Sequence, residues 1–206
     1  MAEPPLRPRP RRRPDHPTLA WIAPTALALS GLALGALPQA GPGMPGARAL
    51  ELRGSTVFVR PPWKAELRST NTNVGEGNVE HYLTIELSPE AGAALGQLEI
   101  QQIRGADTTF LSRLDRARAF RGRPRREGEA IPVELRFDAG TGQLRLTFPQ
   151  PVAPGTTRTV ALRTWRNPWE GDTYLFQVVA WPAGENPVAS PVGVGTLRIY
   201  SPVEWF

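Results

Sequence analysis

Residues 173–181 read TYLFQVVAW, a run of aromatic and β-branched residues that contains no proline or glycine. Turn-forming residues flank the run on both sides. This composition is typical of a β-strand that is buried on at least one face. Alternate residues of a strand point to opposite faces, so Tyr174, Phe176 and Val178 are expected to share one face. A strand this apolar requires partner strands, and the rest of the chain offers candidates.

The clearest candidate is a hairpin between residues 131 and 148. Apolar and polar residues alternate in residues 131–137 and again in residues 144–148. The segment between them, Asp138–Gly142, consists of residues that favour turns. A period of two on both sides of such a segment predicts two half-buried strands joined by a turn.

Further candidates recur along the chain. The alternation between Tyr82 and Leu87 indicates another half-buried strand, and five other segments have a strand-like composition. They are Ser55–Val59, Leu98–Ile103, Thr108–Leu111, Thr157–Leu162 and Val194–Tyr200. Roughly seven to nine short strands separated by turn signals predict an all-β fold, an antiparallel β-sandwich of the immunoglobulin-like type.

Two segments between the strands receive other predictions. Residues 64–79 are polar and contain two glycines, so we expect a long loop there. Ser88-Pro89-Glu90 has the composition of a helix start, with serine as the N-cap, proline in the first turn and an acidic residue beside it. Gly96 would end that helix. The predicted sandwich therefore includes one short helix.

Residues 1–49 differ in composition from the rest of the chain. A basic, proline-broken head precedes an apolar run from Leu19 to Leu37, and the segment ends at Ala47-Arg48-Ala49. These are the three parts of a secretory signal peptide, and we predict cleavage after Ala49. The apolar run is also close to the ~20 residues that span a bilayer, so an uncleaved membrane anchor is the alternative. Residues 50–206 would then form a single β-sandwich domain in the periplasm or outside the cell.

The charge and the cysteine count exclude several classes of function. The first 49 residues carry 6 of the 24 basic residues and 2 of the 19 acidic ones, so the remainder has 18 basic and 17 acidic residues. A net charge near +1 gives no support for nucleic-acid binding. The domain has no cysteine and therefore no disulfide framework. Its only histidine, His81, is the single nitrogen or sulfur ligand that it could offer to a zinc ion. We expect no metal or other cofactor, and we interpret His81 as a strand-edge residue without a catalytic role.

Carboxylates alone could still support hydrolysis, because glycosidases require only two acidic residues a fixed distance apart. Glu80, Glu86, Glu99 and Glu134 fall at outward positions of the predicted strands. Solvated faces explain them, and a carboxylate-dependent hydrolase is kept as the alternative function. That alternative requires two carboxylates that face each other across a cleft.

A cluster of arginines is the strongest indication of a binding site. Seven lie between residues 113 and 126, and guanidinium groups suit phosphates and carboxylates. They are Arg113, Arg116, Arg118, Arg121, Arg123, Arg125 and Arg126. The alternative interpretation is a solvated loop, since the chain uses arginine almost everywhere that lysine could serve.

Four tryptophans fall at strand ends or in loops: Trp63, Trp165, Trp169 and Trp181. Tryptophans in such places commonly close the open ends of a sandwich core. They can also stack on a partner, as interface anchors do. We include Trp165 and Trp169 with the arginine cluster in the predicted binding surface.

Several motifs resemble a cyanobacterial family known as domain of unknown function 2808. The segments that carry the resemblance are Phe58–Pro62, Ser88–Gly92, Leu114–Gly122, Phe148–Thr157 and Arg166–Glu185, in which Trp181 replaces the family's usual phenylalanine. The resemblance implies an exported cyanobacterial protein and brings no established activity or site residues. The predicted function is that of a non-enzymatic cell-envelope domain that acts by binding or structure. Its expected partner is an anionic glycan, a lipid head group or an acidic protein, and a membrane is involved only through an uncleaved anchor.

Overall fold

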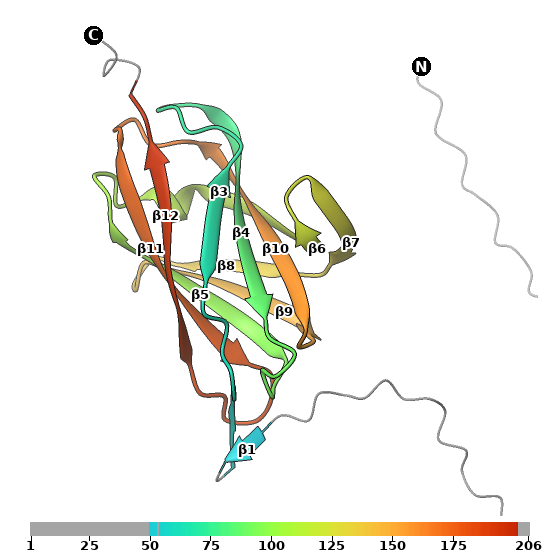
Figure 1. Cartoon of the computed structure of the whole chain (residues 1–206). Helices are drawn as coiled ribbons and strands as arrows, with labels where there is room; N and C mark the ends of the chain where they lie inside the picture. Colours follow the sequence, from blue (N-terminus) through green and yellow to red (C-terminus); the bar gives the residue numbers. More distant parts are fainter. Residues whose placement is uncertain (1–49, 53, 202–206) are drawn as a thin grey trace, which may run out of the picture. The chain divides into compact units, whose positions relative to one another are not determined.

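Two five-stranded antiparallel sheets pack against each other in the computed structural model, which describes residues 50–52 and 54–201 (Figure 1). The first sheet has the strand order β3-β4-β10-β6-β7 and the second β12-β11-β5-β9-β8, while β1 and β2 form a separate pair. The strands are β1 (Leu50–Leu52), β2 (Ser55–Val57), β3 (Ala65–Ser69), β4 (Gly77–Leu87), β5 (Leu95–Arg104), β6 (Leu114–Arg123), β7 (Arg126–Ile131), β8 (Glu134–Asp138), β9 (Gln143–Val152), β10 (Thr156–Arg166), β11 (Asp172–Pro182) and β12 (Ser190–Ile199). The predicted immunoglobulin-like β-sandwich is confirmed.

The core lies between the two sheets and is built by strand alternation. In β11 the inward side chains of Tyr174, Phe176 and Val178 are at most 2% exposed. From the first sheet, Leu83 and Leu162 belong to the same buried cluster. The predicted face of β11 is therefore confirmed, and so is the hairpin of β8 and β9, whose strands pair across Asp138–Gly142.

The short helix lies elsewhere in the chain than predicted. Ser88–Ala91 is a turn closed by the Ala91 amide on the Ser88 carbonyl, and Gly92 follows in the left-handed region with φ of 73°. That conformation stops a helix after one turn. A 3₁₀ helix instead occupies Phe110–Arg113, where an extended segment was expected. Phe110 and Leu111 are both buried, and adjacent residues of a strand cannot both face the core.

The prediction of a loop over residues 64–79 is also wrong, because its first part is strand β3. Ala65 pairs with Ile85 of β4 and Leu67 with Leu83, so both point toward the core. Glu66 and Arg68 alternate with them and point outward. A five-residue edge strand with a single large apolar residue gives only a weak sequence signal.

The predicted signal peptide, its alternative as a membrane anchor and the cleavage position after Ala49 all lie outside the described residues. Among the residues that the structure describes, no helix is long and apolar enough to span a membrane.

Candidate functional site

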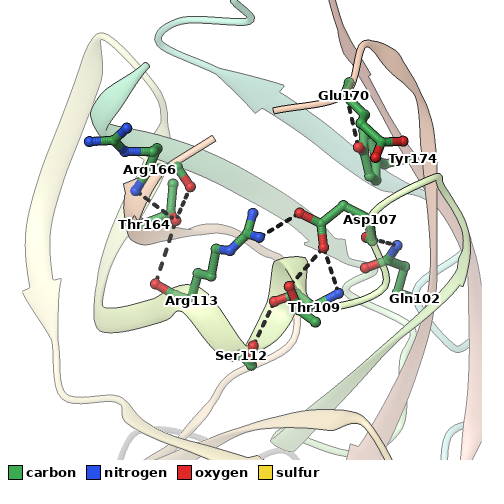
Figure 2. A network of polar contacts seen from close by, with 9 residues as sticks. All are labelled: Gln102, Asp107, Thr109, Ser112, Arg113, Thr164, Arg166, Glu170 and Tyr174. Atoms are coloured by element: carbon green, nitrogen blue, oxygen red, sulfur yellow. Dashed lines mark hydrogen bonds and ion pairs between the residues drawn. The ribbon is translucent and has the colours of Figure 1, made fainter. Parts of the chain in front are cut away.

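The predicted arginine cluster does not form one site. Arg113 belongs to a polar network at one end of the sandwich, where its Nη2 lies 2.6 Å from Oδ2 of Asp107 (Figure 2). Burial alone would raise the pKa of Asp107, but hydrogen bonds from Thr109 and the charge of Arg113 lower it overall. Arg113 therefore fixes the loop before the 3₁₀ helix and is not available to a ligand.

Arg118 is held by two acidic residues on the outer face of the first sheet. Its guanidinium donates to both carboxylate oxygens of Glu80 on β4, at 3.2 and 3.0 Å, and to both of Glu127 on β7, at 2.6 and 3.1 Å. These hydrogen bonds raise the pKa of Arg118, and the bond from Arg118 lowers the pKa of Glu80. Glu80 therefore stays ionised, and Arg118 joins β4 to β7 through both carboxylates.

Arg123 connects the end of β6 to strands on the other side of the sheet. It donates to Glu66 on β3 at 2.9 Å and to Glu86 on β4. Strands β3 and β6 are separated by β4 and β10, and neighbouring strands lie about 4.8 Å apart. Arg123 reaches β3 because the tip of the β6–β7 hairpin curls over the outer face. We call this curled hairpin tip the arch.

A bulge at Gly122 lets the arch form. Gly122 has φ of 95°, and a Cβ atom there would lie 2.7 Å from the Arg126 carbonyl oxygen. Its own carbonyl accepts a hydrogen bond from Thr159 Oγ1 at 2.7 Å, and Thr159 in turn lies 3.0 Å from the hydroxyl of Thr84. Thr84 and Thr159 point outward from the sheet and are nevertheless less than 5% exposed. The arch therefore covers part of the outer face.

A polar groove of about 500 Å³ lies beside the arch. Ligand pockets commonly measure ~300–1,000 Å³, so this one has room for a small ligand or part of a chain. Its lining residues are Glu66, Arg68, Ser69, Thr70, Tyr82, Thr84, Arg123, Pro124 and Arg125. Three guanidinium groups face one carboxylate in this lining, so the groove favours an anionic group.

Arg125 lies at the turn of the arch in a conformation that is costly for it. Its φ is 68°, in the left-handed region that glycine adopts freely and other residues rarely do. The side chain is exposed and makes no hydrogen bond or ion pair within the described residues. The backbone thus accepts strain where a free guanidinium borders the groove.

Of the nine lining residues only Arg123 and Arg125 were predicted to bind, and Arg68 and Tyr82 are among the seven that were not. Arg68 donates from Nε to Glu66 at 2.6 Å, and its terminal nitrogens make no hydrogen bond within residues 54–201. The hydroxyl of Tyr82 donates to Glu80 at 2.8 Å. Arg68 was missed because β3 was taken as a loop. The alternation of Ala65 and Leu67 with polar neighbours was the signal that could have found it.

The other predicted residues are scattered. Arg121 lies 3.8 Å from Glu129, and Arg126 begins β7 without an ion pair in the described part of the chain. Arg116 lies on the outer face of β6 and also lacks one. Trp165 and Trp169 are 54% and 65% exposed. They do not close the core, so the alternative role for these two tryptophans is wrong, while their place in a binding surface stays a prediction.

His81 was predicted to lie at a strand edge, and this prediction is wrong. It is the fifth residue of β4, points inward and is 1% exposed, with its ring edge-on to Phe110 at 5.1 Å between ring centres. Burial lowers its pKa to about 4, and the Asn167 side chain opposes this effect. Neither ring nitrogen makes a hydrogen bond of ordinary geometry within the described residues. His81 is thus a neutral core residue at physiological pH.

The acidic residues do not match the alternative of a carboxylate-dependent hydrolase. Glu80 and Glu86 lie on the outer face of the first sheet, whereas Glu99 and Glu134 lie on the outer face of the second. In the groove, hydrogen bonds from Arg68 lower the pKa of Glu66, although a general acid requires a raised one. Within the described residues, no group of three or more acidic or histidine side chains could hold a metal ion.

The sequence pattern of a family described as "Protein of unknown function (DUF2808)" matches residues 55–199. The chain belongs to the DUF2808 family. This confirms the resemblance drawn from the motifs, and the match covers all the strands of both five-stranded sheets of the sandwich. None of the curated proteins matches the chain.

Several solved structures align with this chain at low identity. The C-terminal domain of the antigen I/II-family protein AspA of Streptococcus pyogenes aligns with 66% of this chain and 46% of its own, at 12% identity and a TM-score of 0.40. ACE19, the collagen-binding subdomain of the Enterococcus faecalis surface protein ACE, aligns with 68% of this chain and 97% of its own, at 8% identity and 0.40. The collagen-binding domain of a Staphylococcus aureus adhesin aligns with 70% of this chain and 98% of its own, at 12% identity and a TM-score of 0.35. At these values the likeness carries no argument about a ligand.

Proposed function

We propose that the DUF2808 domain of this chain is a non-enzymatic binding domain of the cell envelope. The groove beside the arch receives a carboxylate or phosphate group of an envelope component. Export by the N-terminal segment is part of the proposal, and it rests on the three-part composition of residues 1–49.

The observation that carries the proposal is the position of Arg125. A non-glycine residue in the left-handed region costs about 1 kcal/mol or more, and such strain concentrates at functional sites. Here the strained residue places a guanidinium without a carboxylate partner at the edge of a groove. On the other side of the groove, Arg68 offers two free terminal nitrogens. An anion bound between them would receive charge-assisted hydrogen bonds from both.

The test is a retention experiment with the purified full-length chain on immobilised anionic polymers at low and raised salt. We expect retention that weakens with salt and is lost in the double variant Arg68→Gln/Arg125→Gln. The matched control is Arg104→Gln/Arg136→Gln, which removes the same charge from exposed positions on the second sheet. If both double variants lose retention equally, net charge alone explains the retention, and the proposed groove is overturned.

Arg125→Gly separates binding from folding. It relieves the left-handed strain and removes the guanidinium, so we expect a chain that unfolds at a higher denaturant concentration but binds more weakly. If Arg125→Gly lowers stability and leaves binding unchanged, Arg125 has no role in the groove.

A further inference from the structure

An aromatic and cationic surface begins at Trp165, which points outward at one end of the face that carries the groove. The guanidinium carbon of Arg166 is 5.3 Å from the ring centre of Trp165 and 4.7 Å from that of Trp169. The two indoles are 54% and 65% exposed. We call Trp165, Arg166 and Trp169 the tryptophan platform. A cation between two exposed indoles fixes the orientation of both rings.

Buried contacts hold the platform in place. Asn167 is fully buried, and its side-chain nitrogen donates to the carbonyls of Asn71 and Asn73 at 3.1 and 2.9 Å. The backbone N–H of Asn167 donates to the Glu76 carbonyl at 2.7 Å. The backbone of the β10–β11 loop is therefore bonded at several points to the β3–β4 loop.

Glycine allows Trp169 to lie on that neighbouring loop. Gly75 has φ of 65°, and a Cβ atom there would lie 2.3 Å from the Trp169 ring. Thr164 Oγ1 donates to the Arg166 carbonyl at 2.9 Å and so fixes the start of the loop (Figure 2). The indoles are therefore exposed on a fixed backbone, as binding anchors are.

Three arginines at or beside the platform, Arg116, Arg163 and Arg166, form no ion pair within the described residues, although Glu80 lies across from Arg163. Arg116 on β6 and Arg163 on β10 are cross-strand partners on the outer face, where like charges repel. Arg163 donates only to the neutral Asn78, at 2.8 Å, and Arg116 and Arg166 have no carboxylate partner within the described residues. The nearby Glu80 is already bonded to Arg118. An anionic ligand would relieve this repulsion.

Trp165 of the platform and the groove lie on the same outer face, along strand β10. Trp165 and Thr159 both point outward from β10, six residues apart, which corresponds to about 20 Å of strand. Thr159 adjoins the groove through its pair Thr84. A ligand that contacts both places must be an extended polymer roughly this long.

We propose that the partner is an acidic polysaccharide whose sugar rings stack on Trp165 and Trp169. The flat indole faces fit the apolar faces of sugar rings, and the free guanidinium groups fit their carboxylates. Between platform and groove the face presents polar side chains, whereas a protein interface would require an apolar centre. The net charge near +1 of residues 50–206 is low for a protein that binds a nucleic-acid backbone. This inference rests on the proposed function, because the same polymer enters the groove.

The test is a titration of the full-length chain followed by tryptophan fluorescence. The probes are oligogalacturonate, a neutral oligosaccharide of the same length, phosphatidylglycerol vesicles and an oligodeoxythymidylate. We expect oligogalacturonate to bind most tightly. In Trp165→Ala/Trp169→Ala its affinity falls at least about tenfold, and the loss persists at raised salt because stacking is not screened. In Arg116→Gln/Arg163→Gln the loss diminishes as salt rises.

Matched variants keep the test specific. Trp63→Ala removes an indole that is 76% exposed and lies beside Glu86 and Thr157, at the other end of β10 from Trp165, and it should leave the contribution of the platform unchanged. Trp165→Phe/Trp169→Phe retains aromatic faces and should bind better than the alanine variant. Binding by the phenylalanine variant also excludes misfolding as the cause of the loss.

The outcomes separate this inference from the proposed function. If Trp165→Ala/Trp169→Ala binds normally while Arg68→Gln/Arg125→Gln does not, the result supports the groove as the binding site and overturns the platform as a polysaccharide site. The reverse result would restrict the polymer to the platform and overturn the groove, and with it the inference that one polymer contacts both. Tighter binding of the vesicles or of the oligodeoxythymidylate than of oligogalacturonate would overturn the polysaccharide as partner.

Discussion

Arginines on one face of the first sheet follow two different patterns. At the arch, Arg118 and Arg123 are each bonded to two carboxylates that come from other strands. Near the tryptophan platform, Arg116 and Arg163 have no carboxylate, and Arg166 lies against two indoles. The residue type is the same in both regions. What differs is whether an ion pair forms: Glu80 is the cross-strand neighbour of Arg163, but both of its carboxylate oxygens bond to Arg118.

We infer from this difference that Arg118 and Arg123 stabilise the fold, whereas the arginines near the platform are able to bind a partner. The ion pairs of Arg118 and Arg123 tie the arch to β3 and β4, so a ligand would have to displace carboxylates to reach them. The arginines near the platform offer their hydrogen-bond donors without such competition. The comparison can be tested separately on each side by changes that affect one region and spare the other.

As the pH falls, the first loss in the free energy of unfolding should come from His81, near the platform. His81, next to Asn167, has a pKa of about 4 in the folded protein against 6.5 for an ordinary histidine. Between these values the unfolded chain binds the proton and the folded chain does not, so stability falls as the pH drops from 6.5 to 4. The expected decrease in the free energy of unfolding is about 3 kcal/mol. Urea unfolding followed by tryptophan fluorescence between pH 7 and pH 4 measures it.

The arch provides the contrast in the same experiment. The pKa of Glu66 and that of Glu80 are lowered by Arg68 and Arg118, respectively, so their stabilising effect is lost only as the pH falls below their ordinary value of 4.5. The control variant is His81→Leu, which should unfold with little pH dependence between 6.5 and 4.5. An unchanged slope in that variant would contradict the assignment to His81.

Removal of Asn167 should damage the platform without touching the arch. Asn167→Ala leaves the carbonyls of Asn71 and Asn73 without their donor in a buried place. We expect a loss of about 2 kcal/mol in the free energy of unfolding, together with a shifted emission of the platform tryptophans. Thermal and denaturant unfolding measure the loss. Asn73→Ala is the control, because its exposed side chain makes no hydrogen bond within the described residues, and a similar loss there would contradict the role of Asn167.

The sequence was sufficient for elements with a strong local pattern. Strand β11 and the β8–β9 hairpin were predicted because alternation and turn residues are local properties. Strand β3 was missed because a short edge strand needs β4 beside it before its alternation has meaning. The short helix was misplaced because Ser88-Pro89-Glu90 also suits a turn, and Gly92 decided between the two.

The candidate site was predictable in its residue types but not in its grouping. Seven arginines close in sequence suggested one surface, yet strand pairing divides them among the end network, the arch and the open face. Arg163 lies beside Arg116 only because β10 pairs with β6 in that register. Such long-range register depends on the whole core, and no local spacing in the chain encodes it.

The smallest effect we predict is also the most direct test of the comparison. Arg118→Gln should lower the free energy of unfolding by about 1 kcal/mol, a modest value because the side chain is 45% exposed. It leaves Glu80 and Glu127 close together without the guanidinium between them. Arg116→Gln removes the same charge two residues away and relieves its repulsion with Arg163, so we expect no loss or a slight gain. Denaturant unfolding of both variants at low and raised salt measures the difference, which should shrink as salt screens the ion pairs. If the two variants lose the same stability, the two groups of arginines do not differ as the structure indicates.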